Sequence, residues 1–221
     1  MTARDYAAVI VPRIQDLVTS QLPSIEAAGR LVAGAIGDGH VIWLTQTSHT
    51  IHLEGTHRAG GLMAARTLES IDEIERGDVV IIGTSAGTSQ GTVDLAEEAH
   101  ARGAVVIALT GVAFENDPRM VRGHANGRVL HEEADLTVDL ASPFGDGEFT
   151  LAGTGVQILP SSGATGVVAL WMIFAEAVSI LVADGKVPLM WQSNIVPGGQ
   201  ARNETISADY ARTKRGYAAA D

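Results

Sequence analysis

The stretch that decides the fold is Asp78-Val-Val-Ile-Ile-Gly-Thr-Ser-Ala-Gly-Thr-Ser-Gln-Gly91, a β-branched run followed by a loop of hydroxyls and glycines. Residues 79–82 are typical of a parallel strand that is covered on both faces. A helix is expected from about Thr92 to Arg102, and its positive N-terminal end would lie beside the loop. Because glycine lets a ligand approach the backbone N–H groups closely, this stretch predicts an anion-binding loop between a strand and a helix.

The type of anion is narrowed by what the loop lacks. No Gly-Lys-Ser/Thr follows the strand, which excludes a P-loop, and the glycine spacing is not that of a dinucleotide site. No lysine lies near the loop in the sequence. Neutral hydroxyls and amides suit a single sugar phosphate better than a triphosphate with its metal. The alternative is that Thr84, Ser85 and Ser89 only cap the helix and close the turn.

Composition limits the classes of protein to which the chain can belong. Its 221 residues, 46% hydrophobic, can form one substantial core. We expect a single domain with N-terminal helices (1–36), a core (37–185) and a C-terminal extension (186–221). The net charge of −11 argues against nucleic acid and anionic membrane surfaces as partners. The absence of cysteine and of a signal-peptide pattern at the N-terminus favours a cytoplasmic protein.

The order of the expected elements predicts an α/β fold. Apolar residues at helical spacing in 4–36, interrupted by Pro12 and Pro23, indicate one or two helices. After them, strands alternate with helices, which is typical of a three-layer αβα, doubly wound, mostly parallel sheet of five strands. The expected strands are 39–45, 61–68, 79–82, 104–110 and 136–140. Ligands of such folds bind beyond the carboxyl ends of the strands, where the turn 46–48 and the loop 83–91 would converge.

One apolar segment resembles a membrane span. Its longest uninterrupted apolar run, 166–175, ends at Glu176 and is well short of the roughly 18 residues that a span needs. We interpret 164–183 as a helix that is buried in the core or at a subunit interface, with Ser161 and Ser162 as possible N-caps and Gly185 as its stop.

The hydroxyl loop carries a family resemblance. Thr84-Ser85-Ala86-Gly87-Thr88-Ser89 resembles the Ser-x-Ser-Gly-x-Ser/Thr loop of the sugar isomerase (SIS) domain, the flavodoxin-like phosphosugar-binding fold of phosphoheptose isomerases and glucosamine-6-phosphate synthase. More closely, the chain resembles the bacterial UPF0309 group, whose members often carry the name phosphoheptose isomerase. The resemblance covers about 39–203. It also involves Ser48-His49 with Glu54, Arg58 to Leu62, Glu133 to Leu136, Pro143 to Asp146, Pro160 to Ser162, Glu176 to Val178, and Asn194-Ile195.

The resemblance implies a set of ligand-binding residues. They are Ser48, Thr84, Ser85, Gly87, Thr88 and Ser89, for a sugar phosphate ligand. The sequence differs from the family's loops in two places. Leu44-Thr-Gln-Thr-Ser48 keeps the serine of the family's first turn but lacks both its glycines, and Ala86 replaces the second serine. A lost hydrogen bond weakens binding by about 1 kcal/mol. Thr47, Ser85 and Thr88 could compensate, or the substrate has changed.

Isomerisation of a phosphosugar needs a base that moves a proton between adjacent carbons, and polar groups that stabilise the enediolate. It needs no redox cofactor, and we expect none. The resemblance implies Glu54 on the helix after the first loop, or Glu69 in the loop after the second strand, as the carboxylate base. Each is equally compatible with a solvated surface acid. His49 would hydrogen-bond the substrate or transfer a proton.

A metal is not expected. Zinc-dependent phosphoheptose isomerases carry a histidine followed four residues later by a glutamate, whereas Leu53 follows His49 and Thr56 follows His52. We interpret His52 and His57 as packing or surface residues, and His124 and His131 as flanking a mobile surface loop.

Two classes of function follow. The first is an enzyme, a sugar-phosphate isomerase or, by the same proton abstraction, a SIS-type lyase or etherase. The second is a sugar-phosphate-binding regulatory module without catalysis, which Ala86 and the lost glycines favour. The apolar helix at 164–183 and the SIS resemblance also predict a homodimer or higher homo-oligomer.

Overall fold

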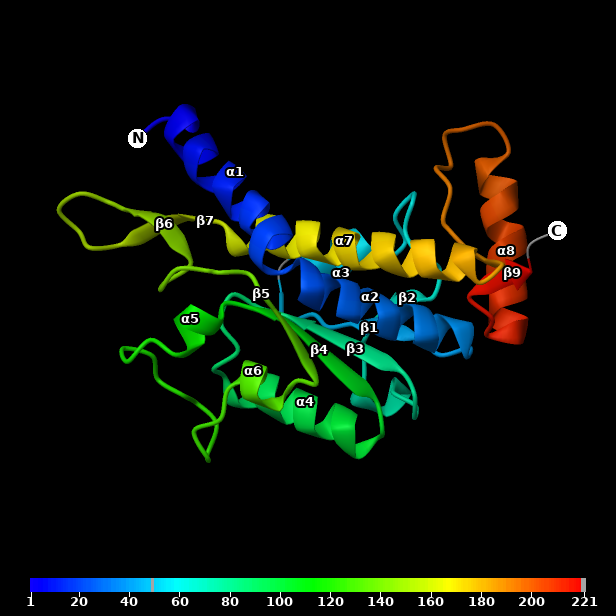
Figure 1. The fold of residues 1–221 in the computed structure, drawn as a ribbon, viewed down its shortest axis with the longest axis horizontal. Helices are drawn as coiled ribbons and strands as arrows, with labels where there is room; N and C mark the ends of the chain where they lie inside the picture. Colours follow the sequence, from blue (N-terminus) through cyan, green and yellow to red (C-terminus); the bar gives the residue numbers. More distant parts are fainter. Residues whose placement is uncertain (49, 220–221) are drawn as a thin grey trace.

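The computed structural model describes residues 1–48 and 50–219 (Figure 1). At its centre is a sheet of five strands in the spatial order β2, β1, β3, β4, β5, and every neighbouring pair is parallel. The strands are β1 (Ile42–Leu44), β2 (Ala65–Thr67), β3 (Val79–Gly83), β4 (Val105–Thr110) and β5 (Leu136–Asp139). The predicted α/β fold with a five-stranded parallel sheet is confirmed.

Helices cover both faces of this sheet, which gives the three layers. Figure 1 shows α1, α2 and α7 on one side and α4 and α6 on the other. The helices are α1 (Ala3–Ser20), α2 (Leu22–Gly37), α3 (Ile51–Gly55), α4 (Gln90–Ala101), α5 (Val112–Glu115), α6 (Leu130–Glu133), α7 (Ser162–Ala183) and α8 (Gly199–Thr213), with a 3₁₀ turn η1 (Ile71–Glu73). Pro12 lies inside α1, and Pro23 lies in the first turn of α2, where proline is tolerated.

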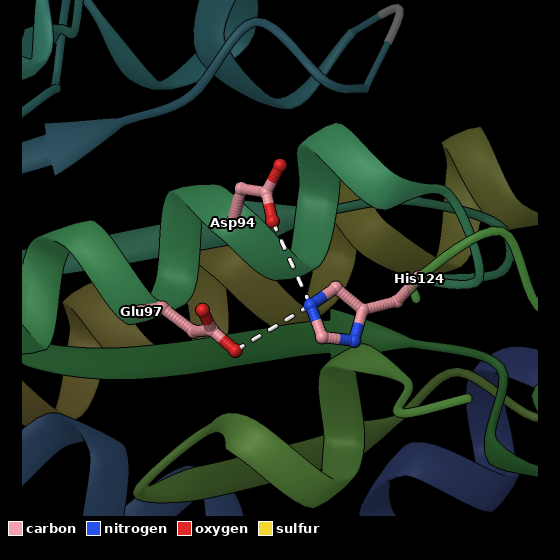
Figure 2. A group of neighbouring side chains, drawn as sticks. All are labelled: Asp94, Glu97 and His124. Carbon is pink, nitrogen blue, oxygen red and sulfur yellow. Dashed lines mark ion pairs between the residues drawn. The ribbon is translucent and has the colours of Figure 1, made fainter. Parts of the chain in front are cut away.

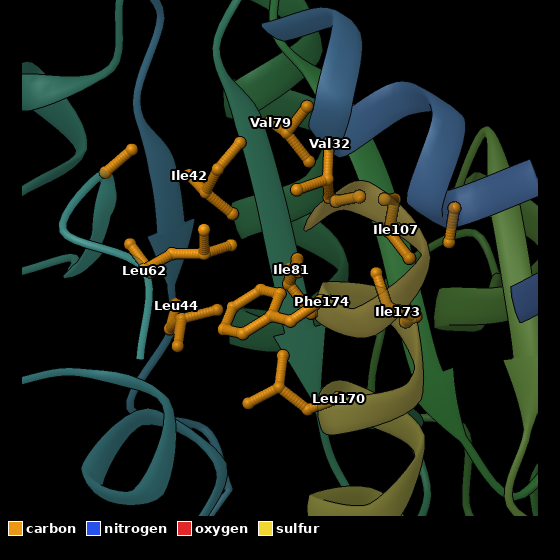
Figure 3. Packing of buried hydrophobic residues seen from close by; sticks show 14 of the residues in the cluster. Val32, Ile42, Leu44, Leu62, Val79, Ile81, Ile107, Leu170, Ile173 and Phe174 are labelled. Carbon is orange, nitrogen blue, oxygen red and sulfur yellow. The ribbon is translucent and has the colours of Figure 1, made fainter. Parts of the chain in front are cut away.

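Successive side chains of each strand point to opposite faces of the sheet, so the strands contribute to two separate apolar cores. Ile42 and Leu44 of β1 pack with α2 and α7, whereas Trp43 faces the opposite core under α4. Figure 3 shows the larger core, in which Phe174 of α7 lies among the side chains of the sheet. Both faces of the central strands are therefore buried, as their continuous apolar runs predict.

The packing of α2 on α7 depends on a glycine. A Cβ atom at Gly29 of α2 would lie 2.4 Å from the Cβ atom of Glu176 and 3.3 Å from the carbonyl oxygen of Ile173, both on α7. The two backbones approach closely there, and Gly29 is buried. Gly34, in the same helix, is exposed, and a Cβ atom added to it would meet no atom of the described residues within 4 Å.

Helix α7 has a further property. Among the described residues it is the one helix that is long and apolar enough, by length and composition alone, to cross a membrane. Residues along one side of it, including Leu170, Ile173 and Phe174, are buried in the core. One side of α7 therefore belongs to the core. Gly185, with φ of +71°, follows its C-terminus as expected.

Two short antiparallel ribbons were not expected from the sequence. The ribbon β6 (Gly147–Thr150) with β7 (Gln157–Pro160) extends away from the sheet beside α1 (Figure 1). Arg13 of α1 fastens it, because its guanidinium donates to Glu148 at 3.0 Å and to the carbonyl oxygen of Ala141 at 2.9 Å. The ribbon β8 (Lys186–Pro188) with β9 (Tyr217–Ala219) joins the end of α7 to the C-terminal segment.

The contact between α2 and α7 generates a paired prediction. Gly29→Ala should lower the free energy of unfolding by about 1–3 kcal/mol, because the added methyl group overpacks the interface. Gly34→Ala should leave it unchanged or raise it by up to about 1 kcal/mol, because alanine favours the helix and meets nothing. Urea denaturation of the two variants and the wild type measures both changes. Equal stability of the two variants would contradict the close approach of the helices.

Candidate functional site

The carboxyl ends of β1 and β3 bring the two predicted loops together. Both strands run in the same direction, so the turn after Leu44 and the loop after Gly83 leave the same edge of the sheet. Gly83 permits their contact, since a Cβ atom there would lie 2.3 Å from Cδ1 of Ile51 and 3.3 Å from Cβ of Ser48. Thr47 also reaches across, and its hydroxyl donates to the carbonyl oxygen of Gly83 at 2.8 Å. Gly83, the last residue of β3, therefore allows the two loops to meet.

A cavity of about 220 Å³ opens where these loops meet; we call it the carboxyl-edge cavity. Hydroxyl groups dominate its polar lining, and among the described residues that border it none is cationic. The polar side chains are those of Thr47, Ser48, Thr50, Thr84, Ser85, Asp146 and Ser162. Three of the predicted ligand-binding residues, Ser48, Thr84 and Ser85, thus share one cavity.

These three hydroxyls differ in how far the protein already uses them. The Ser48 hydroxyl accepts from the backbone N–H groups of Thr50 and Ile51, both at 3.3 Å, and so begins α3. The Thr84 hydroxyl donates weakly to the carbonyl oxygen of Ala86 at 3.3 Å. Within the described chain the Ser85 hydroxyl has no hydrogen-bond partner, although the side chain is half-buried. Thr84 and Ser85 are the hydroxyls most available to a ligand.

Asp146 is a carboxylate of this cavity that the sequence analysis did not single out as a site residue. It accepts from the backbone N–H of Ser162 at 3.2 Å and from the Ser162 hydroxyl at 2.6 Å, so it occupies the N-terminal end of α7. A negative charge is stabilised at that position by the helix dipole. The only sequence signal was the segment 143–146 in the family resemblance.

A second cavity of about 320 Å³ adjoins the first, and Thr47 borders both. We call it the Glu69 cavity. Glu69 is exposed, and its carboxylate accepts a hydrogen bond of 2.9 Å from the side-chain amide of Gln46. Gln46 follows β1, whereas Glu69 follows β2, so the pair joins two neighbouring strand ends. Glu69 therefore lies at the same edge of the sheet as the hydroxyl loops.

The second half of the hydroxyl loop is engaged elsewhere. The Ser89 hydroxyl accepts from the N–H of Thr92 at 3.3 Å and caps α4, which supports the capping alternative for this residue. The carbonyl oxygen of Thr88 accepts from the N–H of Gly123 at 2.8 Å. Thr88 is buried, and neither residue borders the two cavities.

Gly87 is held by a buried carboxylate. Glu115 of α5 has no exposed surface, and it accepts from the N–H of Gly87 at 2.8 Å and from the Thr110 hydroxyl at the end of β4. It also accepts from the N–H of His131 at 3.2 Å and from Nδ1 of its ring at 2.5 Å. A Cβ atom at Gly87 would lie 2.8 Å from Glu115 Oε1 and 2.2 Å from the Cβ atom of Leu130. Glu115 thus fixes the hydroxyl loop to β4 and α6.

The other predicted catalytic residues lie apart from these cavities or outside the described residues. Glu54 of α3 forms an ion pair of 2.9 Å with Arg58, which lies after the end of the helix, and it does not border either cavity. His49 lies outside the described residues. The Nδ1 atom of His52 is 3.1 Å from the carbonyl oxygen of Ser48, and His57 packs against Trp191.

One group of side chains has the composition of a metal site (Figure 2). Nε2 of His124 lies 3.7 Å from Asp94 and 3.6 Å from Glu97, two acids on the same face of α4. The guanidinium of Arg128 contacts the same oxygen of Glu97 and neutralises it, so a cation already serves this cluster. His124 is 7% exposed and is buried against α4, whereas Gly123, Ala125 and Asn126 of the segment that it flanks are exposed.

The comparisons with known proteins agree with this architecture. A family model described as SIS domain matches residues 63–111, which contain β2, β3, α4 and β4. A UPF0309 protein of Listeria monocytogenes is 26% identical over 93% of this chain and 94% of its own length. A UPF0309 protein of Brucella canis is 27% identical with the same coverage.

Among solved structures, a phosphoheptose isomerase from Francisella tularensis aligns with a TM-score of 0.55 at 15% identity, over 80% of this chain and 98% of that one. A candidate phosphosugar isomerase from Silicibacter pomeroyi aligns with a TM-score of 0.58 at 17% identity. That alignment covers 80% of this chain and 50% of the other protein. At these identities the likeness concerns the fold. Together the comparisons confirm the resemblance of this chain to the SIS domain family, and within it to the UPF0309 proteins.

Proposed function

We propose that this chain binds a sugar phosphate across the carboxyl-edge cavity and the Glu69 cavity, and that it interconverts the aldose and ketose forms of that sugar. The observation that carries the proposal is the meeting of the Ser48, Thr84 and Ser85 hydroxyls in one cavity at the carboxyl ends of parallel strands. Ligands of open α/β sheets bind at this edge. The fold shared with phosphoheptose isomerases supports the proposal by analogy.

In this proposal the two cavities bind different parts of the ligand. The phosphate accepts hydrogen bonds from Thr84 and Ser85, and the sugar extends past Thr47 towards Glu69. Glu69 is then the general base that moves the proton between the two carbons. The amide of Gln46 orients its carboxylate. A SIS-type lyase or etherase would use the same proton abstraction.

A binding module without catalysis is the second candidate. It is favoured by the exposure of Glu69, because an active site that abstracts a C–H proton is typically closed to water. The two candidates agree on the ligand and differ only in the fate of the proton. Glu54 and His49 remain predicted catalytic residues, and the hydrogen-exchange experiment below examines Glu54.

We also propose that the chain is one cytoplasmic domain that forms a homodimer. Apolar side chains lie exposed on two long helices: Val11 and Val18 of α1 are each 52% exposed, and Val182 of α7 is 55% exposed. Exposed apolar surface on long helices is typical of contacts between subunits.

The proposed phosphate position predicts how two variants bind sugar phosphates. Thr84→Ala and Ser85→Ala should each raise the dissociation constant about three- to tenfold, the loss of one ordinary hydrogen bond. Titration calorimetry with fructose 6-phosphate, glucosamine 6-phosphate and sedoheptulose 7-phosphate measures this. Ser89→Ala is the matched control, because its hydroxyl caps α4: it should lower stability without changing affinity. Equal affinity of all three variants and the wild type would refute the assigned phosphate position.

Hydrogen exchange tests the base. In deuterated water, the wild type should introduce deuterium next to the carbonyl carbon of the bound sugar phosphate, as followed by NMR. Glu69→Gln should slow this exchange by about 10² or more while keeping the affinity. Glu54→Gln should exchange at the wild-type rate, because Glu54 pairs with Arg58. Normal exchange by Glu69→Gln would rule out Glu69 as the base, and no exchange by the wild type would favour the binding module.

The mass in solution tests the assembly. Light scattering should give twice the chain mass of 23.0 kDa, or a higher multiple of it. Val18→Asp should shift the distribution towards the single chain, since a charge buried in an apolar interface is costly. A wild-type mass of one chain would contradict the proposed homodimer.

A further inference from the structure

A further cavity lies away from the hydroxyl loops. It has a volume of about 630 Å³, and it is formed by the segment after α3, the segment after β8 and the first half of α8. We call it the Trp191 cavity. It shares no lining residue with the carboxyl-edge cavity or the Glu69 cavity. Its size falls within the range of small-molecule sites.

The polar groups of this cavity include four side-chain amides, and one of them, that of Asn203, is buried. Asn203 of α8 is 8% exposed, and it donates to the carbonyl oxygen of Gln192 at 2.7 Å while accepting from the N–H of Gln192 at 2.9 Å. It also donates to Oδ1 of Asn194 at 2.9 Å. Asn203 therefore fixes both the backbone and the Asn194 side chain, whose own amide hydrogens stay available to a ligand.

The turn between Asn194 and α8 requires two glycines. Gly198 has φ of +79°, a conformation that favours glycine, and a Cβ atom at Gly199 would lie 2.1 Å from the carbonyl oxygen of Ser193. This turn brings Asn203 and Gln200 back to Gln192 and Asn194. The amides are thus placed by a specific backbone path.

An aromatic surface forms the other part of the lining. The rings of Trp191 and His57 lie 5.3 Å apart, centroid to centroid, with an angle of 42° between their planes. The position of Trp191 is set by backbone pairing, because its carbonyl oxygen accepts from Gly60 at 2.7 Å and its N–H donates to Gly61 at 2.9 Å. His57 has φ of +50°, which is uncommon for a residue with a side chain and clusters at ligand sites.

The side chains of the lining indicate the class of ligand. Glu204 is its one carboxylate, and no lysine or arginine is among the lining residues described. The carboxyl-edge cavity likewise has one carboxylate and no lysine or arginine among its described lining residues, so the aromatic surface and the amides, rather than charge, indicate the ligand here. Amides that donate and accept match the adjacent hydroxyls of a sugar, and an aromatic ring packs against the apolar C–H face of the sugar ring. We propose that the Trp191 cavity is a second binding site, for an uncharged sugar.

The experiment uses the full chain and neutral probes. Glucose, N-acetylglucosamine and maltotriose are titrated up to about 50 mM, well above the millimolar constants of weak ligands. Binding is followed by tryptophan fluorescence and by saturation-transfer NMR. We expect at least one of the three to bind. Failure of all three neutral sugars to bind would overturn the proposal.

Three variants locate the binding. Asn194→Ala and Trp191→Ala should each raise the dissociation constant about tenfold, because each removes a direct contact. Ser85→Ala, in the other cavity, should leave it unchanged, so this site can fail while the proposed phosphosugar site stands, and the reverse. Asn194→Ala leaves the aromatic surface and the hydrogen bonds between Asn203 and Gln192 in place. Its dissociation constant therefore still tests the site if the Trp191→Ala variant does not fold. Wild-type affinity in both Asn194→Ala and Trp191→Ala would place the sugar elsewhere and refute the assignment.

Discussion

The close packing of α2 on α7 is the contact on which the other parts of the molecule depend. A parallel sheet needs apolar cover on both faces, and on one face these two helices supply it. Gly29 lets their backbones approach, which seats Ile173 and Phe174 in the sheet core. Because α7 is 22 residues long, its position also fixes two distant regions: its first turn borders the carboxyl-edge cavity, and its end leads into β8 and towards Trp191.

A second fixed point lies on the opposite side of the hydroxyl loop. Glu115 accepts hydrogen bonds from Gly87, Thr110 and His131, which belong to three separate segments. Moving the loop would leave a buried carboxylate without donors, and the free-energy cost of that is high. The loop is therefore already shaped before a ligand arrives, and little ordering is needed on binding. The hydroxyl loop divides into a half that faces the cavity and a half that holds the protein together.

Much of the fold could be predicted from local sequence. The apolar runs at 79–82 and 104–110 identify central strands, because strands buried on both faces need continuous apolar residues. The ribbons β6–β7 and β8–β9 were missed, since they are short, mostly exposed and lack that pattern.

The candidate site was predictable only where its residues follow strands directly, as Ser48, Thr84 and Ser85 do. Asp146 and Glu115 reach their places through contacts between distant segments, and a single sequence carries no local signal for those contacts. The same holds for His124, which lies in a polar, glycine-containing segment and yet is buried against α4. Asn194 was part of the family resemblance, but the cavity that it borders also depends on the backbone pairing of Trp191 with Gly60 and Gly61, which the sequence does not indicate.

The absence of cations around the described hydroxyls of the carboxyl-edge cavity has a consequence for selectivity in the cell. Sites that rely on lysine and arginine attract every polyanion, and ionic strength weakens them all. This chain has a net charge of −11, so it repels polyanions at a distance. Its cavity of hydroxyls then binds a ligand only where the ligand's acceptors match those hydroxyls. Nucleotides and nucleic acids, abundant as they are, would thus be kept from the hydroxyl loop by long-range repulsion, while a small ligand with a single anionic group experiences far less of it.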